Sequence, residues 1–435
     1  MIIYMKKNEE YIVTCIDDTD LNSGVCKIND QIVFVPTLLI GEQARIKIVK
    51  VNKTYAFGII LELLKPSKQR QELSCSVAKT CGGCQLQHMR YAYQLEYKYK
   101  HVKKLFDSIE VRPILGMDTP WYYRNKAQFP VQVMDGKVKM GFYRQHSNDI
   151  VCCKECKIQD PMINQVYQFI QKHVTATMAK DLRHVFIRHA KTNEVQVVFI
   201  GKNEKNILPL IPLLKDAFSN LTSIVFNYNT RNDNVILGEK YKVLYGNEYI
   251  TEECLGNQVK LHFKSFFQVN PIQMEVLYTQ ALQAAHLTGK ETCIDMYAGI
   301  GTIGMAASRY CKKVIGVEIV KEAVENANEN VKLNHLSNCT YICEDASAFA
   351  HAYRNKKVDV IFIDPPRKGM SENGIQDTVT MQPNTIVYVS CNPKTLARDL
   401  KIFKNLGYTC QYVQPVDMFC QTTGLECVAK LTKIV

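Results

Sequence analysis

The sequence predicts a multidomain protein with a small N-terminal β-barrel, a central α+β domain and a C-terminal α/β domain built on a mostly parallel sheet. Three observations support this fold class. The chain has 435 residues, which is too long for one ordinary hydrophobic core. Short strands with turn signals fill the first segment, and strands alternate with helices in the last one. We expect the domains at 1–68, 69–260 and 261–435.

The composition is typical of a globular cytosolic protein. Apolar residues make up 46% of the chain, yet no run of about 18 apolar residues is long enough to cross a membrane. The first ten residues carry charges where a signal peptide needs an apolar segment. We therefore expect a cytoplasmic protein with no membrane partner and no evident obligate protein partner. In the cytosol, 17 cysteines favour free thiols, metal ligands or catalysis over disulfides.

The N-terminal domain is predicted to be a small closed barrel because five short strands follow one another quickly. These strands are expected at 11–16, 24–28, 31–35, 44–51 and 56–64. The residues Ser-Gly-Val at 23–25, Val-Phe-Val-Pro at 33–36 and Ile-Gly-Glu at 40–42 resemble the TRAM domain. This OB-like barrel is found attached to RNA-modifying enzymes, so the resemblance implies contact with RNA.

The net charge of +12 is concentrated at the start of the central domain. After a polar linker at 65–70, the whole segment 65–105 contains nine Lys or Arg residues against two Asp or Glu residues. A helix is expected at 91–105, with tyrosines at positions 91, 93, 97 and 99. Cations interleaved with aromatic rings suit RNA, but a solvated helix with a tyrosine face in the core fits equally well. We also expect the segment 91–125 to pack on the C-terminal domain.

A glycine loop in the C-terminal domain indicates a nucleotide-like cofactor. The predicted strand 292–296 runs directly into the loop 297–304, and the next strand ends at Glu318. Such a loop lets the backbone approach a ligand, while the acidic residue accepts hydrogen bonds from ribose hydroxyls. Asp295 before the loop and Asp364 at the end of a later strand argue against a nicotinamide dehydrogenase. The pattern resembles the Rossmann-like class I S-adenosylmethionine (SAM) methyltransferases.

Cys391 stands where a predicted buried strand, 385–389, gives way to a helix at 394–405. Asn392 is suited to cap that helix, and Pro393 suits its first turn. Because a helix N-terminus stabilises negative charge, we expect the pKa of the Cys391 thiol to fall. The alternative is that Cys391 is simply a small buried residue, since free cysteines are often buried.

A thiolate and a carboxylate together suit methylation of an unactivated ring carbon such as uracil C5. The thiolate adds to C6 and makes C5 electron-rich, and a base later removes the C5 proton. Glu426 follows Cys391 in the segment 419–426, and Asp-Pro-Pro-Arg at 364–367 precedes it. These motifs resemble the RNA (uracil-5-)-methyltransferase family over nearly the whole chain. The resemblance is closest to 23S ribosomal RNA enzymes that carry a TRAM domain and an iron-sulfur cluster.

The resemblance implies a role for each matching residue. Cys391 corresponds to the nucleophile and Glu426 to the base. Residues matching the SAM site are Gln268, Tyr297, Gly299, Glu318 and Asp364. The segment 123–126, Tyr-Arg-Asn-Lys, also matches the family and is a candidate for RNA contact. The chain departs from the family at Gly424, where a histidine is common, and at Cys420, where a proline is usual.

Four cysteines form a candidate metal site, and the remaining nearby thiols are Cys152 and Cys153. Four thiolates bind either zinc or an iron-sulfur cluster, and their spacing does not separate the two. The resemblance implies a [4Fe-4S] cluster and excludes Cys152 and Cys153 as ligands. A radical-SAM enzyme would need a CxxxCxxC run instead. The implied ligands are Cys75, Cys81, Cys84 and Cys156.

The sequence therefore predicts an enzyme that methylates uridine C5 in RNA, with 23S ribosomal RNA as the expected partner. The same chemistry on transfer RNA is one alternative. A non-catalytic RNA-binding factor in ribosome assembly is another, although it would have no need for both Cys391 and Glu426. An adenine amino-methyltransferase fits less well, because Arg367 stands where such enzymes often have an aromatic residue.

Overall fold

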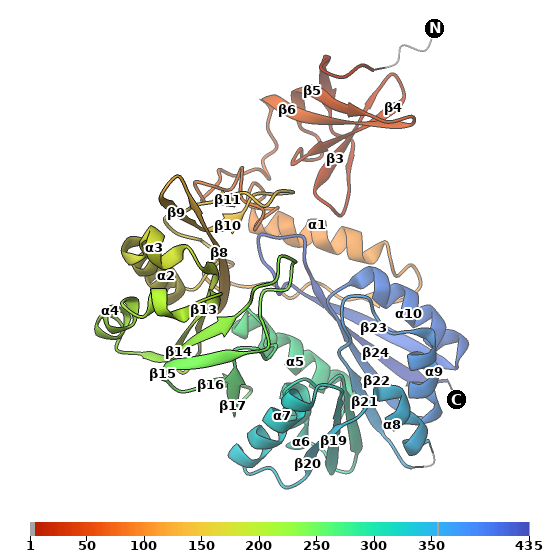
Figure 1. Ribbon diagram of the computed structural model, residues 1–435. Coiled ribbons are helices and arrows are strands. Elements are labelled where there is room, and N and C mark those ends of the chain that lie inside the picture. Colours follow the sequence, from red (N-terminus) through yellow and green to blue (C-terminus); the bar gives the residue numbers. More distant parts are fainter. Residues whose placement is uncertain (1–4, 355, 435) are drawn as a thin grey trace.

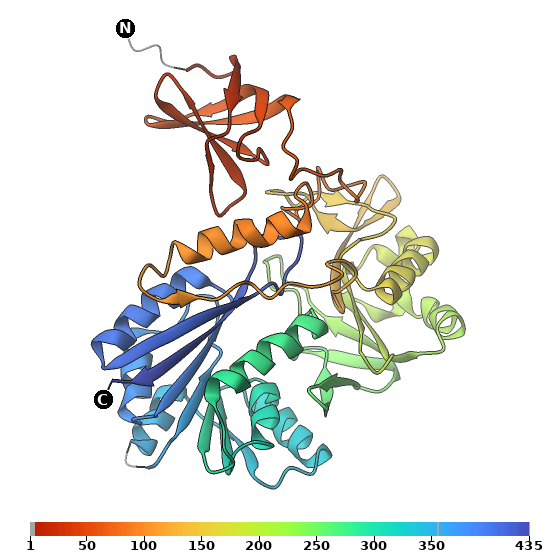
Figure 2. The ribbon, with the colours of Figure 1, turned by 180° about the vertical axis from the view of Figure 1, so that it is seen from behind.

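The computed structural model describes residues 5–354 and 356–434. The N-terminal barrel lies at one end of the molecule, with helix α1 (Tyr91–Lys103) between most of it and the C-terminal domain (Figures 1 and 2). One turn of the barrel contacts α1 and the C-terminal domain. The central domain lies beside the C-terminal domain in both views. No helix in the described part of the chain is both long and apolar enough to span a bilayer.

The barrel is a six-stranded sheet with the order β1-β5-β6-β4-β3-β2. Beyond β1, the amide of Ile16 donates to the carbonyl of Val25 on β3, so the sheet curls back on itself. All five predicted strands are present, and the sequence missed only the two-residue β2. The bounds are β1 (Glu10–Thr14), β2 (Asp17–Asp18), β3 (Ser23–Ile28), β4 (Gln31–Pro36), β5 (Gln43–Val51) and β6 (Tyr55–Lys65).

The tyrosines of α1 serve packing rather than a free aromatic surface. Tyr97 is 3% exposed, and its hydroxyl donates to the carbonyl of Thr19 and accepts from the amide of Asn22 in the barrel. The Tyr91 hydroxyl donates to Asp417 in the C-terminal domain. Of the two interpretations open at the sequence level, the structure supports the tyrosine face in the core.

The central domain is built on a six-stranded sheet with the order β15-β14-β13-β12-β8-β9. Its helices are α2 (Pro161–His173), α3 (Ala176–Ala179) and α4 (Leu210–Ala217), with a 3-10 turn at Glu204–Ile207. The strands of the large sheet are β8 (Lys126–Met134), β9 (Lys137–Met140), β12 (Leu182–His189), β13 (Val195–Gly201), β14 (Leu221–Tyr228) and β15 (Tyr241–Gly246). Two small antiparallel pairs are β10 (Phe142–Tyr143) with β11 (Ile150–Val151), and β16 (Tyr249–Cys254) with β17 (Asn257–His262).

The C-terminal domain carries an eight-stranded sheet with the order β20-β19-β18-β21-β22-β24-β23-β7. The five strands from β20 to β22 are parallel, and β24 pairs antiparallel with both neighbours. The predicted alternation of strands and helices is therefore correct. The strands are β18 (Thr292–Met296), β19 (Lys313–Glu318), β20 (Cys339–Cys343), β21 (Val360–Ile363), β22 (Thr385–Ser390), β23 (Tyr408–Val416) and β24 (Glu426–Lys433).

Six helices of the described chain cover this sheet, and the segment after α1 adds a short strand to its edge. β7 (Glu110–Val111) pairs in parallel with β23, and Val102 and Phe106 lie in the same hydrophobic core as β21 and β22. The segment following α1 therefore contacts the C-terminal domain. The helices are α5 (Pro271–Ala285), α6 (Thr302–Ser308), α7 (Lys321–Leu333), α8 (Ala346–Tyr353), α9 (Glu372–Thr380) and α10 (Pro393–Asn405).

A single loop between β23 and β24, residues 417–424, makes contacts with several parts of the molecule. We call it the junction loop. The carbonyl of Gln421 accepts hydrogen bonds from the amide of Gln85 at 3.0 Å and from the amide of Leu86 at 2.9 Å. Both residues follow the cysteine motif directly. The Tyr123 hydroxyl donates to the carbonyl of Cys420 at 2.8 Å. The junction loop therefore links the cysteine-rich segment to the strand that begins at Glu426.

The junction loop is held to α1 by a buried ion pair. Lys98 Nζ lies 2.5 Å from Asp417 Oδ1, and the two side chains are 2% and 0% exposed. Lys98 also donates to the carbonyls of Phe419 at 3.2 Å and Gly424 at 2.9 Å. These bonds satisfy the buried ammonium group, which would otherwise be costly.

Replacing Lys98 with Met should lower the free energy of unfolding by about 3–5 kcal/mol, because Asp417 is left charged and buried without its cation. Urea titration followed by circular dichroism measures this loss. Lys103→Met on the exposed side of α1 is the matched control and should change stability by about 0.5 kcal/mol or less. Equal losses in the two variants would show that the ion pair does not hold the loop.

Candidate active site

The candidate catalytic residues meet at one edge of the C-terminal sheet. Tyr297 follows β18, Asp364 follows β21 and Cys391 follows β22, so all three lie at carboxyl ends of parallel strands. Ser390 pairs with Cys427 across the antiparallel β22–β24 ladder. Continuing this register by one residue puts Cys391 opposite Glu426. The structure thus brings together residues that lie far apart in the sequence.

Two carboxyl groups at this edge lack a partner among the described residues: Glu426, which is buried, and Asp364, which is partly exposed. Glu426 is 2% exposed, and its pKa is raised well above the usual value by burial and then by the negative charge of Asp364. Burial raises the pKa of Asp364 to about 7. Within residues 5–354 and 356–434, neither side chain makes a hydrogen bond or ion pair. Buried carboxyl groups that lack partners are costly to keep, and they cluster at functional sites.

The predicted fall in the pKa of Cys391 is wrong, because the pKa is raised. Burial is the largest cause, and the carboxylates of Glu426 and Asp364 add to it, while Arg367 opposes them. The local geometry was predicted correctly: Asn392 caps α10 by accepting from the amide of Lys394 at 3.1 Å. A helix N-terminus contributes only about 0.3–1 kcal/mol at an exposed position, which desolvation and two nearby carboxylates outweigh.

The glycine loop leaves space for a ligand beside β18. Gly299 has a φ of +56°, and a Cβ atom added there would meet no atom within 4 Å. The amide of Gly299 donates to Glu318 Oε2 at 3.0 Å, so the loop and the acidic residue lie together. Next to Glu318, Ile319 is 66% exposed, an apolar surface suited to an adenine ring. These residues fit SAM.

Asp295 is buried behind the glycine loop and supports it through a backbone hydrogen bond. It is 2% exposed, and its Oδ2 accepts from the amide of Gly304 in α6 at 2.9 Å. The pKa of Asp295 is raised to about 7, mainly by burial and to a smaller extent by the charges of Asp364 and Glu318. A side chain at Gly301 would clash, since a Cβ atom there would lie 2.5 Å from the ring of Tyr341.

Gln268 and Phe266 lie in the turn that precedes α5. Gln268 is 4% exposed, and its amide makes no hydrogen bond within the described residues, which leaves it available for a ligand. Phe266 is 69% exposed, and the sequence analysis did not single it out. The signal was present, because two adjacent phenylalanines in a short turn place at least one ring outside the core.

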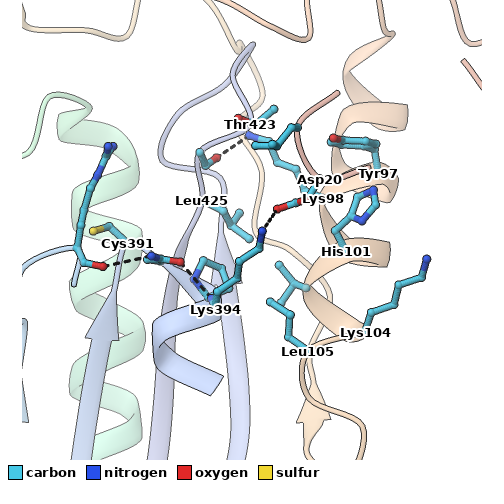
Figure 3. A pocket seen from close by; sticks show the side chains of 16 residues that line it. Asp20, Tyr97, Lys98, His101, Lys104, Leu105, Cys391, Lys394, Thr423 and Leu425 are labelled. Atoms are coloured by element: carbon cyan, nitrogen blue, oxygen red, sulfur yellow. Dashed lines mark hydrogen bonds and ion pairs between the residues drawn. The ribbon is translucent and has the colours of Figure 1, made fainter. Parts of the chain in front are cut away.

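A cavity of about 550 Å³ adjoins Cys391 (Figure 3). Its walls come from three parts of the chain: the barrel turn at Asp20 and Leu21, helix α1, and the segments around Cys391 and Gly424. Packing of the segment 91–125 on the C-terminal domain was expected, but no sequence pattern predicted that the barrel would also reach Cys391. We call this space the target cavity.

Gly424 contributes through its backbone in this structure. Its carbonyl accepts from Lys98, and its amide donates to Thr422 Oγ1 at 3.1 Å. A Cβ atom at this position would lie 3.0 Å from the ring of Phe419. The histidine common in the family would therefore need a shift of Phe419, so the departure at 424 is matched by its surroundings.

The four candidate metal ligands line one cavity of about 60 Å³. Burial raises the pKa of the Cys84 thiol to about 12 and that of Cys156 to about 11. The Cys81 thiol adds to both shifts, which places these sulfurs near one another. Cys153 also lines this cavity, whereas Cys152 is exposed and does not. The complete set of candidate ligands is Cys75, Cys81, Cys84 and Cys156.

The geometry of this cysteine cavity is not that of a single tightly held ion. In the described residues, no three Cys, His, Asp or Glu side chains are grouped closely enough to hold one metal ion. A tetrahedral zinc site with bonds near 2.3 Å needs sulfurs only about 3.8 Å apart. Iron-sulfur clusters are also held by four thiolates. The described residues show no formed metal site, so both zinc and a cluster stay predictions.

The segment 123–126 carries cations between the cysteine cavity and the turn before α5. Arg124 lines the cysteine cavity, and its guanidinium lies 5.9 Å from the ring centre of Phe419. Burial, together with the charges of Arg188 and Arg124, lowers the pKa of Lys126 to about 8. The amide of Asn125 donates to the carbonyl of Val269 in the turn that holds Gln268.

Comparison with known proteins gives a consistent result. The family model described as tRNA (uracil-5-)-methyltransferase matches residues 90–434, and the TRAM domain model matches residues 6–61. Uncharacterized RNA methyltransferases of Bacillus cereus and Halalkalibacterium halodurans are each 42% identical to this chain, over 98% of both chains. These matches confirm both resemblances stated from the sequence.

One solved structure resembles nearly the whole molecule. It is the tRNA (uracil-54, C5)-methyltransferase of Pyrococcus abyssi in complex with S-adenosyl-L-homocysteine. It is 28% identical, with a TM-score of 0.74 over 97% of this chain and 99% of that one. Its bound ligand is the product of SAM after methyl transfer, in agreement with the open glycine loop described above. This chain therefore belongs to the tRNA (uracil-5-)-methyltransferase family and is a SAM-dependent RNA methyltransferase with an N-terminal TRAM domain.

Proposed function

We propose that this enzyme methylates uridine C5 in 23S ribosomal RNA, with Cys391 as nucleophile and Glu426 as base. One observation supports the mechanism: a buried carboxyl group, Glu426, and a partly exposed one, Asp364, lie beside the Cys391 thiol at the carboxyl edge of the sheet, and neither has a partner among the described residues. Fold stability alone gives no reason to keep such groups there.

Cys391 begins the reaction by bonding through Sγ to uracil C6. Electron density then moves to C5, which becomes able to accept a methyl group. SAM, when bound at the glycine loop, supplies that methyl group. Because the pKa of the free thiol is raised, Cys391 must first give up its proton, which passes to the solvent in the adjoining cavity before Sγ bonds to C6. Arg367 favours the thiolate, since its charge opposes that of the carboxylates.

Glu426 completes the reaction by removing the C5 proton, after which the bond between Sγ and C6 breaks. A carboxylate with a raised pKa is a stronger base than an exposed one. Its burial also keeps bulk water away from the adduct. Gln268 supplies an uncommitted amide near the reacting ring, and Phe266 supplies an exposed ring for stacking on a base.

Two classes of RNA are candidates for the substrate. The resemblance to ribosomal RNA enzymes with a TRAM domain and a cysteine cluster supports 23S ribosomal RNA. Transfer RNA is the second candidate, because the similar Pyrococcus abyssi enzyme is described as acting on uracil 54 of transfer RNA. In either case the target base must leave its stack to reach Cys391.

The cysteine cavity is proposed to hold a [4Fe-4S] cluster through Cys75, Cys81, Cys84 and Cys156. Its place beside Gln85 and Leu86, which donate to the junction loop, supports a structural role. Zinc is the alternative occupant.

Replacing Glu426 with Gln should trap the protein on its RNA. Methyl transfer would still occur, but the C5 proton would remain, so the bond between Cys391 and C6 could not break. A band of protein bound to RNA that survives denaturing gel electrophoresis measures this adduct.

The matched control for this adduct is the double variant Cys391→Ala and Glu426→Gln, which should bind SAM but form no band. An adduct in the double variant would exclude Cys391 as the nucleophile. Full turnover by the Glu426→Gln single variant would exclude Glu426 as the base.

Deleting the gene should remove 5-methyluridine from 23S ribosomal RNA and leave transfer RNA unchanged. Mass spectrometry of nucleosides from the separated RNAs, with and without the gene, measures both. Loss from transfer RNA alone would replace the proposed substrate by the second candidate.

Protein purified without oxygen should contain about four iron and four sulfide per chain, held by four thiolates. The Cys84→Ser variant should lose most of the iron and sulfide and should melt at a lower temperature, because the cysteine cavity then lacks one ligand. Cys152→Ser, which changes an exposed thiol outside the cavity, should retain them. Zinc without sulfide in the purified protein would contradict the cluster.

A further inference from the structure

The target cavity is walled in part by a turn of the TRAM domain. Asp20 and Leu21, between β2 and β3, line it together with Lys394 of α10. Asp20 Oδ2 lies 2.5 Å from Lys394 Nζ, and Figure 3 draws this ion pair between Cys391 and the residues of α1. Lys394 is three residues from the nucleophile, so the pair joins the barrel to the catalytic segment.

The turn has its own anchors and does not need this ion pair to stay in place. Tyr97 bonds both Thr19 and Asn22, and the Asn22 side chain donates to the carbonyl of Gln85 at 2.6 Å. On the next turn of α1, Lys100 Nζ lies 2.6 and 2.8 Å from Asp17 and Asp18. Asp20 is thus held above the cavity by neighbours other than Lys394.

The ion pair itself is exposed and weak. The Asp20 and Lys394 side chains are 41% and 60% exposed. Pairs of this kind change an equilibrium by at most about fivefold. A phosphate of RNA carries the same sign of charge as Asp20 and can therefore replace it on Lys394.

The rest of the lining suits a nucleotide. Lys104, Arg367 and Lys394 contribute cations, while Leu105 and Leu425 contribute apolar surface. No ion pair of Arg367 occurs in the part of the chain that the structure describes. The cavity volume of about 550 Å³ lies within the range of sites that bind whole ligands. This volume is larger than one uracil ring requires.

We propose that the target cavity receives a nucleotide flanking the target uridine, and that Lys394 binds its phosphate after leaving Asp20. The carboxylate of Asp20 occupies the phosphate position until RNA arrives. The TRAM turn is then part of the substrate site beside Cys391. This inference rests on the proposed function, since it takes RNA as the substrate.

Binding of a fluorescein-labelled oligouridylate, followed by anisotropy at several salt concentrations, tests the inference. Lys394→Gln should weaken binding roughly three- to tenfold and reduce the slope of log affinity against log salt by about 0.7, the value for one phosphate on a single strand. Asp20→Asn should tighten binding about two- to fivefold, because Lys394 is then free. In the Lys394→Gln background, Asp20→Asn should have no further effect.

Lys357→Gln is the matched control, because Lys357 is an exposed lysine paired with Asp359 at the opposite edge of the sheet. It should change neither affinity nor slope, and unchanged SAM binding in every variant verifies folding. Unchanged affinity and slope in Lys394→Gln would overturn the proposal, as would weaker binding by Asp20→Asn. The assay needs no methyl transfer, so its failure is distinct from failure of the adduct experiment.

Discussion

Lys98 and Asp417 form an ion pair that is hidden from solvent, and the position of the junction loop depends on it. Lys98 binds both the first residue of that loop and the carbonyl of its last residue, Gly424. Glu426 follows two residues later, so a fixed loop also fixes the position of this proposed base. A buried charge tolerates little displacement, because each lost contact exposes an unpaired ion to a low dielectric. Helix α1 therefore orients the active site from outside the sheet that carries it.

The electrostatics of the site keep the thiol of the proposed nucleophile, Cys391, in its protonated form. Burial is the largest cause of the raised pKa of the Cys391 thiol, and the nearby charges of Glu426 and Asp364 add to it. The same burial raises the pKa of Glu426, which strengthens it as a base. A site tuned only for a reactive thiolate would have kept carboxylates away. Here the charge of the proposed base, Glu426, adds to the effect of burial on the thiol of the proposed nucleophile, Cys391, and the charge of Arg367 opposes it.

Local patterns were enough to predict most of the fold. The strand periodicity located β18, β19, β21 and β22 but not β20, and the structure brings Cys391 and Glu426 to the same edge of the sheet as the glycine loop. What the sequence could not provide were effects between distant segments. The direction of the pKa shift at Cys391 depends on Asp364 and Glu426, which only folding brings near. The packing of the α1 tyrosines and the place of Cys153 in the cysteine cavity likewise depend on tertiary contacts.

The three domains are coupled because each one touches the catalytic segment at a different point. The cysteine-rich segment donates two backbone hydrogen bonds to Gln421 of the junction loop, so disorder in that segment would reach Glu426. The barrel turn instead touches α10 beside Cys391, through a pair weak enough for RNA to displace. The first connection consists of backbone hydrogen bonds, whereas the second is an exposed ion pair that another anion can replace. This difference supports the proposals that the cysteine segment helps to place Glu426 and that the barrel turn helps to admit RNA.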